Sequence, residues 1–84
     1  MYEVFLESRA ESDLRRLPAR TYQRVVQELQ GLAQNPRPSG CRKIAGSQND
    51  WRIRIEDYRV IFEIDDKTKA VRVMRVRHRR EAYR

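Results

Sequence analysis

The sequence predicts an α+β fold in two layers, with a two-helix hairpin packed on one face of a small, mainly antiparallel sheet of about four strands. Apolar residues alternate with period two in the second half of the chain, and an amphipathic stripe runs through the first half. Polar or proline-containing segments separate the elements. We expect, in order, a strand, two helices, three or four strands and a short C-terminal helical turn, all in one domain over residues 1–84.

The first half of the chain contains the N-terminal strand and both helices. Residues 2–7 alternate only loosely, which is typical of an inner strand with both faces partly covered. Ser8 has the spacing of a capping box for a helix over residues 9–17, because Glu11 follows three residues later. Pro18 ends that helix, and residues 19–34 form the second. Its core-facing stripe comprises Tyr22, Val25, Val26, Leu29, Leu32 and Ala33.

Residues 51–63 (WRIRIEDYRVIFE) form the hairpin around which the sheet is built. The apolar set changes from odd to even positions at residues 56–57, as a turn with an even number of residues requires. That register sets Arg54 opposite Arg59, with Arg52 further along the same face.

Three arginines on one face of a hairpin repel one another and destabilise the sheet, so their presence requires a compensating interaction with another group. A bound polyanion would supply it, because the guanidinium fork fits phosphate oxygens in pairs and stays charged at any working pH. The alternative is a solvated face on which the arginines meet carboxylates such as Glu63.

Residues 42–45 add a short strand before the hairpin, and residues 70–77 form the last strand after a polar turn. This turn sets Glu63 opposite Arg72. The alternation slips near Met74, which indicates either a bulge or a strand covered on both faces.

Composition limits the partners and the chemistry. The net charge is +7, the pI is near 10.3, and sixteen of the nineteen basic residues are arginine, which favours nucleic acid or an acidic protein segment as partner. One cysteine excludes an internal disulfide, and together with one histidine it leaves no zinc site of these residue types, so we expect no metal and no cofactor. Without a signal-like or membrane-spanning run, we expect a cytoplasmic protein.

The C-terminal tail joins positive charge to groups that can transfer protons. Residues 71–84 contain six arginines and one glutamate, and the order H-R-x-x-x-Y brings His78, Arg79 and Tyr83 to one end of the sheet near Arg59 if the last strand pairs with the hairpin. Metal-free RNA cleavage needs a base for the ribose 2′-OH, cations for the phosphate and a group at the leaving 5′ oxygen. Arginine suits the cationic role. It cannot act as the base, because its pKa is too high for it to be deprotonated.

The segments N-P-R-P, W-R-I-R-I, D-Y-R-V-I-F-E-I and H-R-R-E-A-Y-R together resemble the RelE/ParE superfamily of type II toxin–antitoxin systems, most closely its RelE branch. The resemblance covers nearly the whole chain. It implies a ribosome-dependent messenger-RNA endonuclease that cuts by 2′-OH attack, inhibits translation and is neutralised by a cognate antitoxin.

Carried over residue by residue, the resemblance implies that Arg54 and Arg59 hold the scissile phosphate and that Arg79 assists the leaving group. Tyr83 would orient or activate the 2′-OH, or stack on a base. The expected catalytic residues are Arg52, Arg54, Arg59, His78, Arg79 and Tyr83, and the further RNA contacts are Arg42, Lys43, Arg77 and Arg80.

Two departures from the family pattern bear on the mechanism. Lysine is frequent at the positions of Arg52 and Arg54, and one such lysine is a candidate base, so here the base is Tyr83 or His78. Glu56 stands where glycine is common in the turn. Two other functions remain open: a ParE-type inhibitor of DNA gyrase, and a decayed toxin that binds only its antitoxin, whose acidic tail would also explain the arginines.

Overall fold

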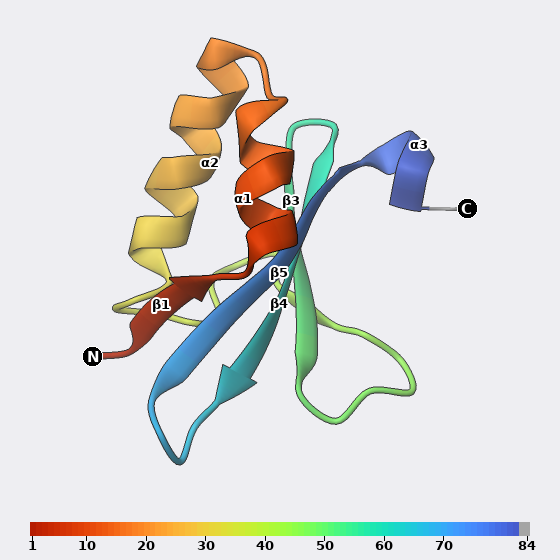
Figure 1. Cartoon of the computed structure of the whole chain (residues 1–84). Helices are drawn as coiled ribbons and strands as arrows, with labels where there is room; N and C mark the ends of the chain where they lie inside the picture. Colours follow the sequence, from red (N-terminus) through yellow and green to blue (C-terminus); the bar gives the residue numbers. More distant parts are fainter. Residues whose placement is uncertain (83–84) are drawn as a thin grey trace.

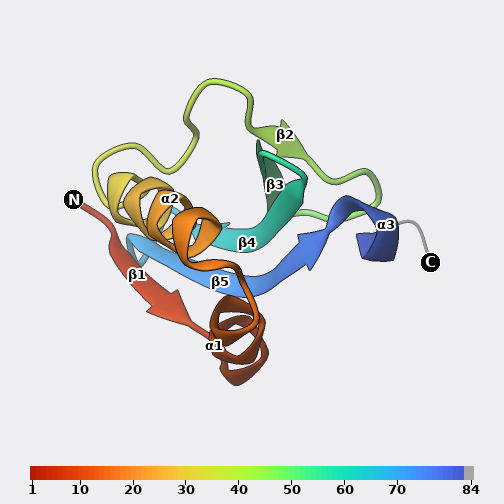
Figure 2. The same cartoon turned by 90° about the horizontal axis from the view of Figure 1, so that it is seen from above.

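A five-stranded mixed sheet carries the helices in the computed structural model, which describes residues 1–82 (Figure 1). The strand order is β1-β5-β4-β3-β2, with α2 over the sheet and α1 beside β5 (Figure 2). The predicted fold class is confirmed, although the sheet has five strands rather than about four. The elements are β1 (Glu3–Leu6), α1 (Ser8–Arg15), α2 (Ala19–Gly31), β2 (Arg42–Lys43), β3 (Asp50–Ile55), β4 (Tyr58–Asp65), β5 (Ala70–His78) and α3 (Arg79–Ala82).

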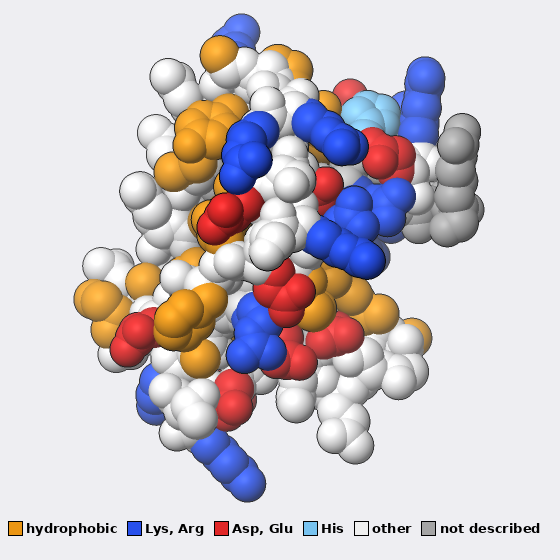
Figure 3. Space-filling view, in the orientation of Figure 1, with side chains coloured by type: hydrophobic (Ala, Val, Ile, Leu, Met, Phe, Trp, Pro, Cys, Tyr) orange, Lys and Arg blue, Asp and Glu red, His pale blue; other side chains and the backbone are white. Residues whose placement is uncertain are grey.

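Strand β1 is an edge strand, so the prediction of an inner strand is wrong. It pairs in parallel with β5, from Glu3 opposite Ala70 onward, because the two-helix crossover returns the chain in the same direction. Val4 packs against the core, whereas Phe5 is 48% and Leu6 39% exposed. Exposed apolar side chains over β1 and α2 are visible in Figure 3. The loose alternation therefore arises because only Val4 of this edge strand packs against the core, and not because both faces of the strand are covered.

Both helices differ from the predicted bounds. Helix α1 begins at Ser8 and its N-cap is Glu7, whose side chain makes no capping hydrogen bond, so the predicted capping box is wrong. Glu7 keeps the extended backbone of β1, which makes Ser8 the first helical residue instead of the cap. Helix α1 ends at Arg15 and α2 at Gly31, each followed by turns. Tyr22, assigned to the buried stripe, is 45% exposed.

The strand pairings follow the predicted register. Arg54 lies opposite Arg59 across a two-residue turn, and Glu63 lies opposite Arg72. The slip in β5 is a bulge at Met74, because β4 pairs with the residues on either side of it. The buried core between the layers is Ala10, Leu14, Val25, Leu29, Leu32, Ile53, Ile55, Val60, Phe62, Ile64, Val71, Val73 and Val76.

Asp13 of α1 fastens that helix to the edge of β5. Strand β1 ends at Leu6, which leaves the following edge of β5 without a strand partner. The Asp13 carboxylate accepts hydrogen bonds there from the Val76 N–H (2.9 Å) and from Arg75 Nε (2.9 Å). Burial raises the pKa of Asp13, but the hydrogen bonds from Arg75 and Val76 and the positive charge outweigh burial, so the pKa is lowered from its ordinary value.

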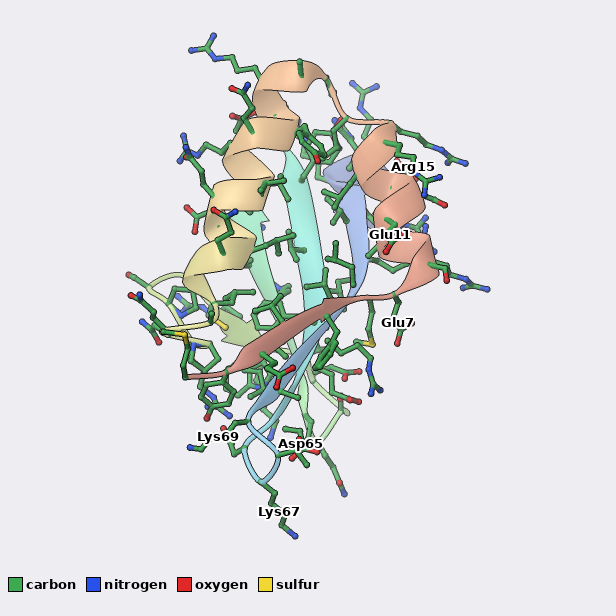
Figure 4. The ribbon with its side chains drawn as sticks, turned by 60° about the vertical axis from the view of Figure 1, so that its left-hand side comes forward. Glu7, Glu11, Arg15, Asp65, Lys67 and Lys69 are labelled. Carbon is green, nitrogen blue, oxygen red and sulfur yellow. The ribbon has the colours of Figure 1, made fainter. Side chains whose placement is uncertain are left out.

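Asp66 connects the long loop after α2 to the β4–β5 turn, where Asp65, Lys67 and Lys69 lie (Figure 4). It accepts two hydrogen bonds from Arg37, at 3.2 and 2.9 Å, and one from the Tyr2 hydroxyl at 2.6 Å. These bonds, that from Arg37 foremost, lower the pKa of Asp66 to about 2. Among residues 1–82, no helix has the length and apolar character needed to cross a membrane.

Candidate functional site

Three arginines from neighbouring strands lie side by side on the face of the sheet that the helices leave uncovered. Arg54 of β3 is opposite Arg59 of β4, which is opposite Arg77 of β5. Their neighbours in the strands, such as Val60 and Val76, are buried on the helix side. We call Arg54, Arg59 and Arg77 the arginine row.

The predicted RNA contacts divide between the two faces of the sheet. Arg52 precedes Arg54 by two residues and therefore shares its face, and Arg42 is opposite Arg52. Lys43, by contrast, is opposite Trp51, which packs against the core from the helix side. The structure thus brings Arg42 and Arg52 to the arginine row and leaves Lys43 on the other face.

The arginine row is partly withdrawn from solvent. The Nε atoms of Arg59 and Arg77 are both buried. An Nη of Arg77 lies 3.6 Å from a carboxylate oxygen of Glu81 in α3, while its Nε has no hydrogen-bond partner among residues 1–82. A buried donor without an acceptor is rare in proteins, and an anionic ligand is one way to satisfy it.

A pocket of about 230 Å³ adjoins the row at the hairpin turn. Among residues 1–82, four arginines and two carboxylates line it; their formal charges sum to +2, which favours an anion. Its lining residues are Arg54, Glu56, Asp57, Tyr58, Arg59, Arg79 and Arg80.

Backbone N–H bonds to the hairpin turn and to His78 position Arg79 and Arg80 at this pocket. The Arg79 N–H donates to the Asp57 carbonyl at 2.7 Å, and the Arg80 N–H donates to His78 Nδ1 at 3.2 Å. The His78 ring packs edge-on against Tyr58, with the ring centres 5.2 Å apart. His78 is opposite Tyr58, two residues before Val60, so it belongs to the helix side of the sheet and is not among the lining residues. Tyr83 lies outside the described residues.

Sequence reasoning missed the two carboxylates of the pocket. The alternation places Glu56 and Asp57 only in the turn, although their position between Arg54 and Arg59 indicates that they flank the same site. Glu56 has a φ of 56°, in the left-handed region that is unfavourable for residues other than glycine. Its Oε1 accepts a hydrogen bond from the Thr21 hydroxyl of α2 at 3.2 Å.

Comparison with known proteins agrees with this architecture. The toxin RelG of Mycobacterium tuberculosis is 34% identical over 87 residues, spanning 99% of this chain and 97% of RelG. The archaeal RelE–RelB complex of Pyrococcus horikoshii OT3 contains a chain that superposes with a TM-score of 0.84 at 26% identity, covering 93% of this chain and 94% of that one. The toxin–antitoxin complex RelBE2 of Mycobacterium tuberculosis gives a TM-score of 0.81 at 28% identity, covering 92% and 96%.

A family model described as the ParE toxin of the type II toxin–antitoxin system parDE matches residues 4–83. That match includes every strand and helix of the structure except the first residue of β1. The chain therefore belongs to the RelE/ParE family of toxins from type II toxin–antitoxin systems.

Proposed function

We propose that this toxin is a ribosome-dependent endoribonuclease that cleaves messenger RNA and so inhibits translation. The observation that supports it best is the arginine row beside the pocket. Adjacent, partly buried guanidinium groups are suited to a phosphodiester, whose oxygens accept the paired hydrogen bonds that arginine donates. Similarity to the toxin RelG and to a RelE chain supports the RelE branch, for which the sequence resemblance implies this reaction.

In the proposed reaction the ribose 2′ oxygen attacks the adjacent phosphorus, and the products are a 2′,3′-cyclic phosphate and a 5′-OH. Arg54 and Arg59 hold the scissile phosphate as negative charge develops on it. Arg79, which lines the same pocket, stabilises the leaving 5′ oxygen. Tyr83 orients the 2′-OH or stacks on a base. None of these steps uses a metal.

The other basic residues extend the contact along the RNA backbone. Arg42, Arg52 and Arg77 continue the arginine face across the sheet, and Arg80 adds a cation at the pocket. Lys43 would contact the RNA only if the RNA strand extends around the edge of the sheet formed by β2. Their contribution should be mainly electrostatic, and hence weakened by salt.

The test is cleavage of messenger RNA on purified, stalled ribosomes, with the new 5′ ends mapped. Wild-type protein should produce 5′-OH ends within the reading frame, with or without a metal chelator. Arg59→Ala should lose about 100-fold in rate or more. The matched control is Arg15→Ala, since Arg15 is an exposed residue of α1 that pairs with Glu11 at 3.7 Å and does not line the pocket. A wild type that leaves the message intact contradicts the proposal.

The second candidate function is inhibition of DNA gyrase, favoured by the description of the matching family model as a ParE toxin. Growth arrest without new RNA ends, together with loss of gyrase supercoiling in the presence of the protein, would establish this function instead. A folded protein that causes neither effect would be a decayed toxin that binds only its antitoxin.

We also propose that a cognate antitoxin neutralises the toxin, because similar chains were solved as toxin–antitoxin complexes. An apolar groove of about 290 Å³ between β1 and the helices suits an amphipathic antitoxin segment, and an acidic segment would cover the arginine row. Adding the protein encoded beside the toxin gene should abolish cleavage in the ribosome assay. The groove is lined by Val4, Leu6, Leu14, Tyr22, Val26, Leu29 and Gln30.

A further inference from the structure

We infer that Glu56 is the general base that removes the proton from the ribose 2′-OH. The inference rests on the proposed ribonuclease function and identifies a catalytic residue that the family resemblance does not supply. Glu56 lines the pocket together with Arg54, Arg59 and Arg79, the residues proposed to hold the phosphate and the leaving group.

Chemistry excludes most other groups near the pocket from this role. Arginine is protonated at every working pH and has no lone pair to accept a proton. His78 is not among the described residues that line the pocket, and its Nδ1 already accepts the Arg80 N–H. A carboxylate is an established general base, and the described part of the chain places two at the pocket, Glu56 and Asp57.

The contacts of Glu56 distinguish it from Asp57. Its Oε1 accepts a hydrogen bond from Thr21 Oγ1 at 3.2 Å, and Thr21 itself is buried on α2. The side chain is therefore held from the helix layer, with Oε2 as the oxygen we assign to accept the proton. For Asp57 the described contact is through its backbone, where the carbonyl accepts the Arg79 N–H at 2.7 Å.

The backbone of Glu56 points to a function as well. A φ of 56° in a two-residue turn is readily adopted by glycine and is strained for glutamate. Strained conformations of this kind persist where the surrounding structure holds them, and they cluster at active sites. The requirement for a carboxylate at this point of the pocket explains a glutamate in a position where glycine would fold more easily.

The proton and bond changes balance in one step. The 2′-OH proton passes to the Glu56 carboxylate, the bond from the 2′ oxygen to phosphorus forms, and the bond from phosphorus to the 5′ oxygen breaks. The 5′ oxygen, stabilised by Arg79, takes a proton from water. Glu56 then returns its proton to solvent and is ready for another cycle.

Single-turnover cleavage on stalled ribosomes tests the assignment with four proteins: wild type, Glu56→Gln, Glu56→Asp and the matched control Glu11→Gln. Glutamine keeps the shape of the side chain and an oxygen for the Thr21 bond, so Glu56→Gln should fold as the wild type does. It should lower the maximal rate by about 10²–10⁴-fold and leave the concentration for half-maximal rate unchanged or lower. Glu56→Asp should be faster than Glu56→Gln, and Glu11→Gln should stay within about threefold of wild type, because Glu11 lies on α1 and does not line the pocket.

The pH profile supplies a readout that a structural role would not move. Wild-type cleavage should slow as the pH falls, whereas the residual rate of Glu56→Gln should lose that dependence. Glu56→Gln within threefold of an active wild type would overturn the inference and leave the proposed function intact. An inactive wild type would overturn the proposed function, and this inference with it.

Discussion

Replacing Asp13 by alanine should destabilise the fold more than any other single change to a charged side chain of α1. Asp13 is only 8% exposed and accepts hydrogen bonds from the Val76 N–H and from two nitrogens of Arg75. The variant leaves the Val76 N–H at the edge of β5 without its acceptor. An unsatisfied buried N–H costs about 1–3 kcal/mol.

The loss of the carboxylate partner of Arg75 costs less, because the Arg75 side chain is 28% exposed and can turn toward water. We assign it about 1 kcal/mol, the upper end for exposed pairs. The two costs sum to about 2–4 kcal/mol. This is a large share of the free energy of unfolding, which is roughly 4–12 kcal/mol for a domain of this length. Asp13→Asn keeps an oxygen for Val76 but loses the charge, so it should cost about 1–2 kcal/mol.

Urea unfolding followed by far-ultraviolet circular dichroism measures both free energies. Glu11→Ala is the matched control, since Glu11 lies on the same helix, is exposed and pairs with Arg15 at 3.7 Å (Figure 4). It should change the free energy of unfolding by less than about 0.5 kcal/mol. If Asp13→Ala were no more destabilising than Glu11→Ala, then Asp13 would not fasten α1 to β5.

Two further predictions concern the tail and the long loop. His78→Asn keeps an acceptor near the position of Nδ1, whereas His78→Leu does not, and both variants lose the ring contact with Tyr58. Amide hydrogen exchange at Arg80 should therefore be several-fold faster in the leucine variant only. Equal rates would contradict the role of His78 Nδ1 as the acceptor for the Arg80 N–H. Because the folded pKa of Asp66 is about 2 and its ordinary value is 3.8, its contribution to stability is present above pH 4 and is lost as the pH falls toward 2. The stability difference between wild type and Arg37→Ala should therefore shrink over that interval in acid unfolding curves, and a constant difference would refute the role of this pair.

The hairpin register was predictable because each strand has one buried face, so a slip of one residue would have buried arginines. The position of Arg54 opposite Arg59 follows from that condition alone. The pairing of β1 with β5 was not predictable, because its four residues have no strict alternation and the parallel contact forms across the whole length of the chain. Edge position depends on which strands lie beside it, and no local pattern encodes that.

The pocket was only half predictable for a similar reason. Alternation assigns strand residues such as Arg59 to a face, but it gives no orientation for side chains in a turn. Glu56 and Asp57 join the site because the turn folds beside α3, through the Arg79 N–H bond to the Asp57 carbonyl, and because α2 reaches Glu56 through Thr21. These contacts link residues that are 22 and 35 positions apart in the chain.

The bulge at Met74 explains how one strand serves both the core and the site. Val71 and Val73 are buried, so in a regular strand Arg75 and Arg77 would face the core and Val76 would face water. Met74 is the extra, unpaired residue of the bulge, so the inward and outward positions beyond it are shifted by one residue. Val76 is therefore buried, and Arg77 lies in the arginine row. It also brings Arg75 and the Val76 N–H to Asp13 of α1. A single inserted residue thus sets the packing of α1 and the third member of the row, so stability and the geometry of the site depend on the same irregularity in β5.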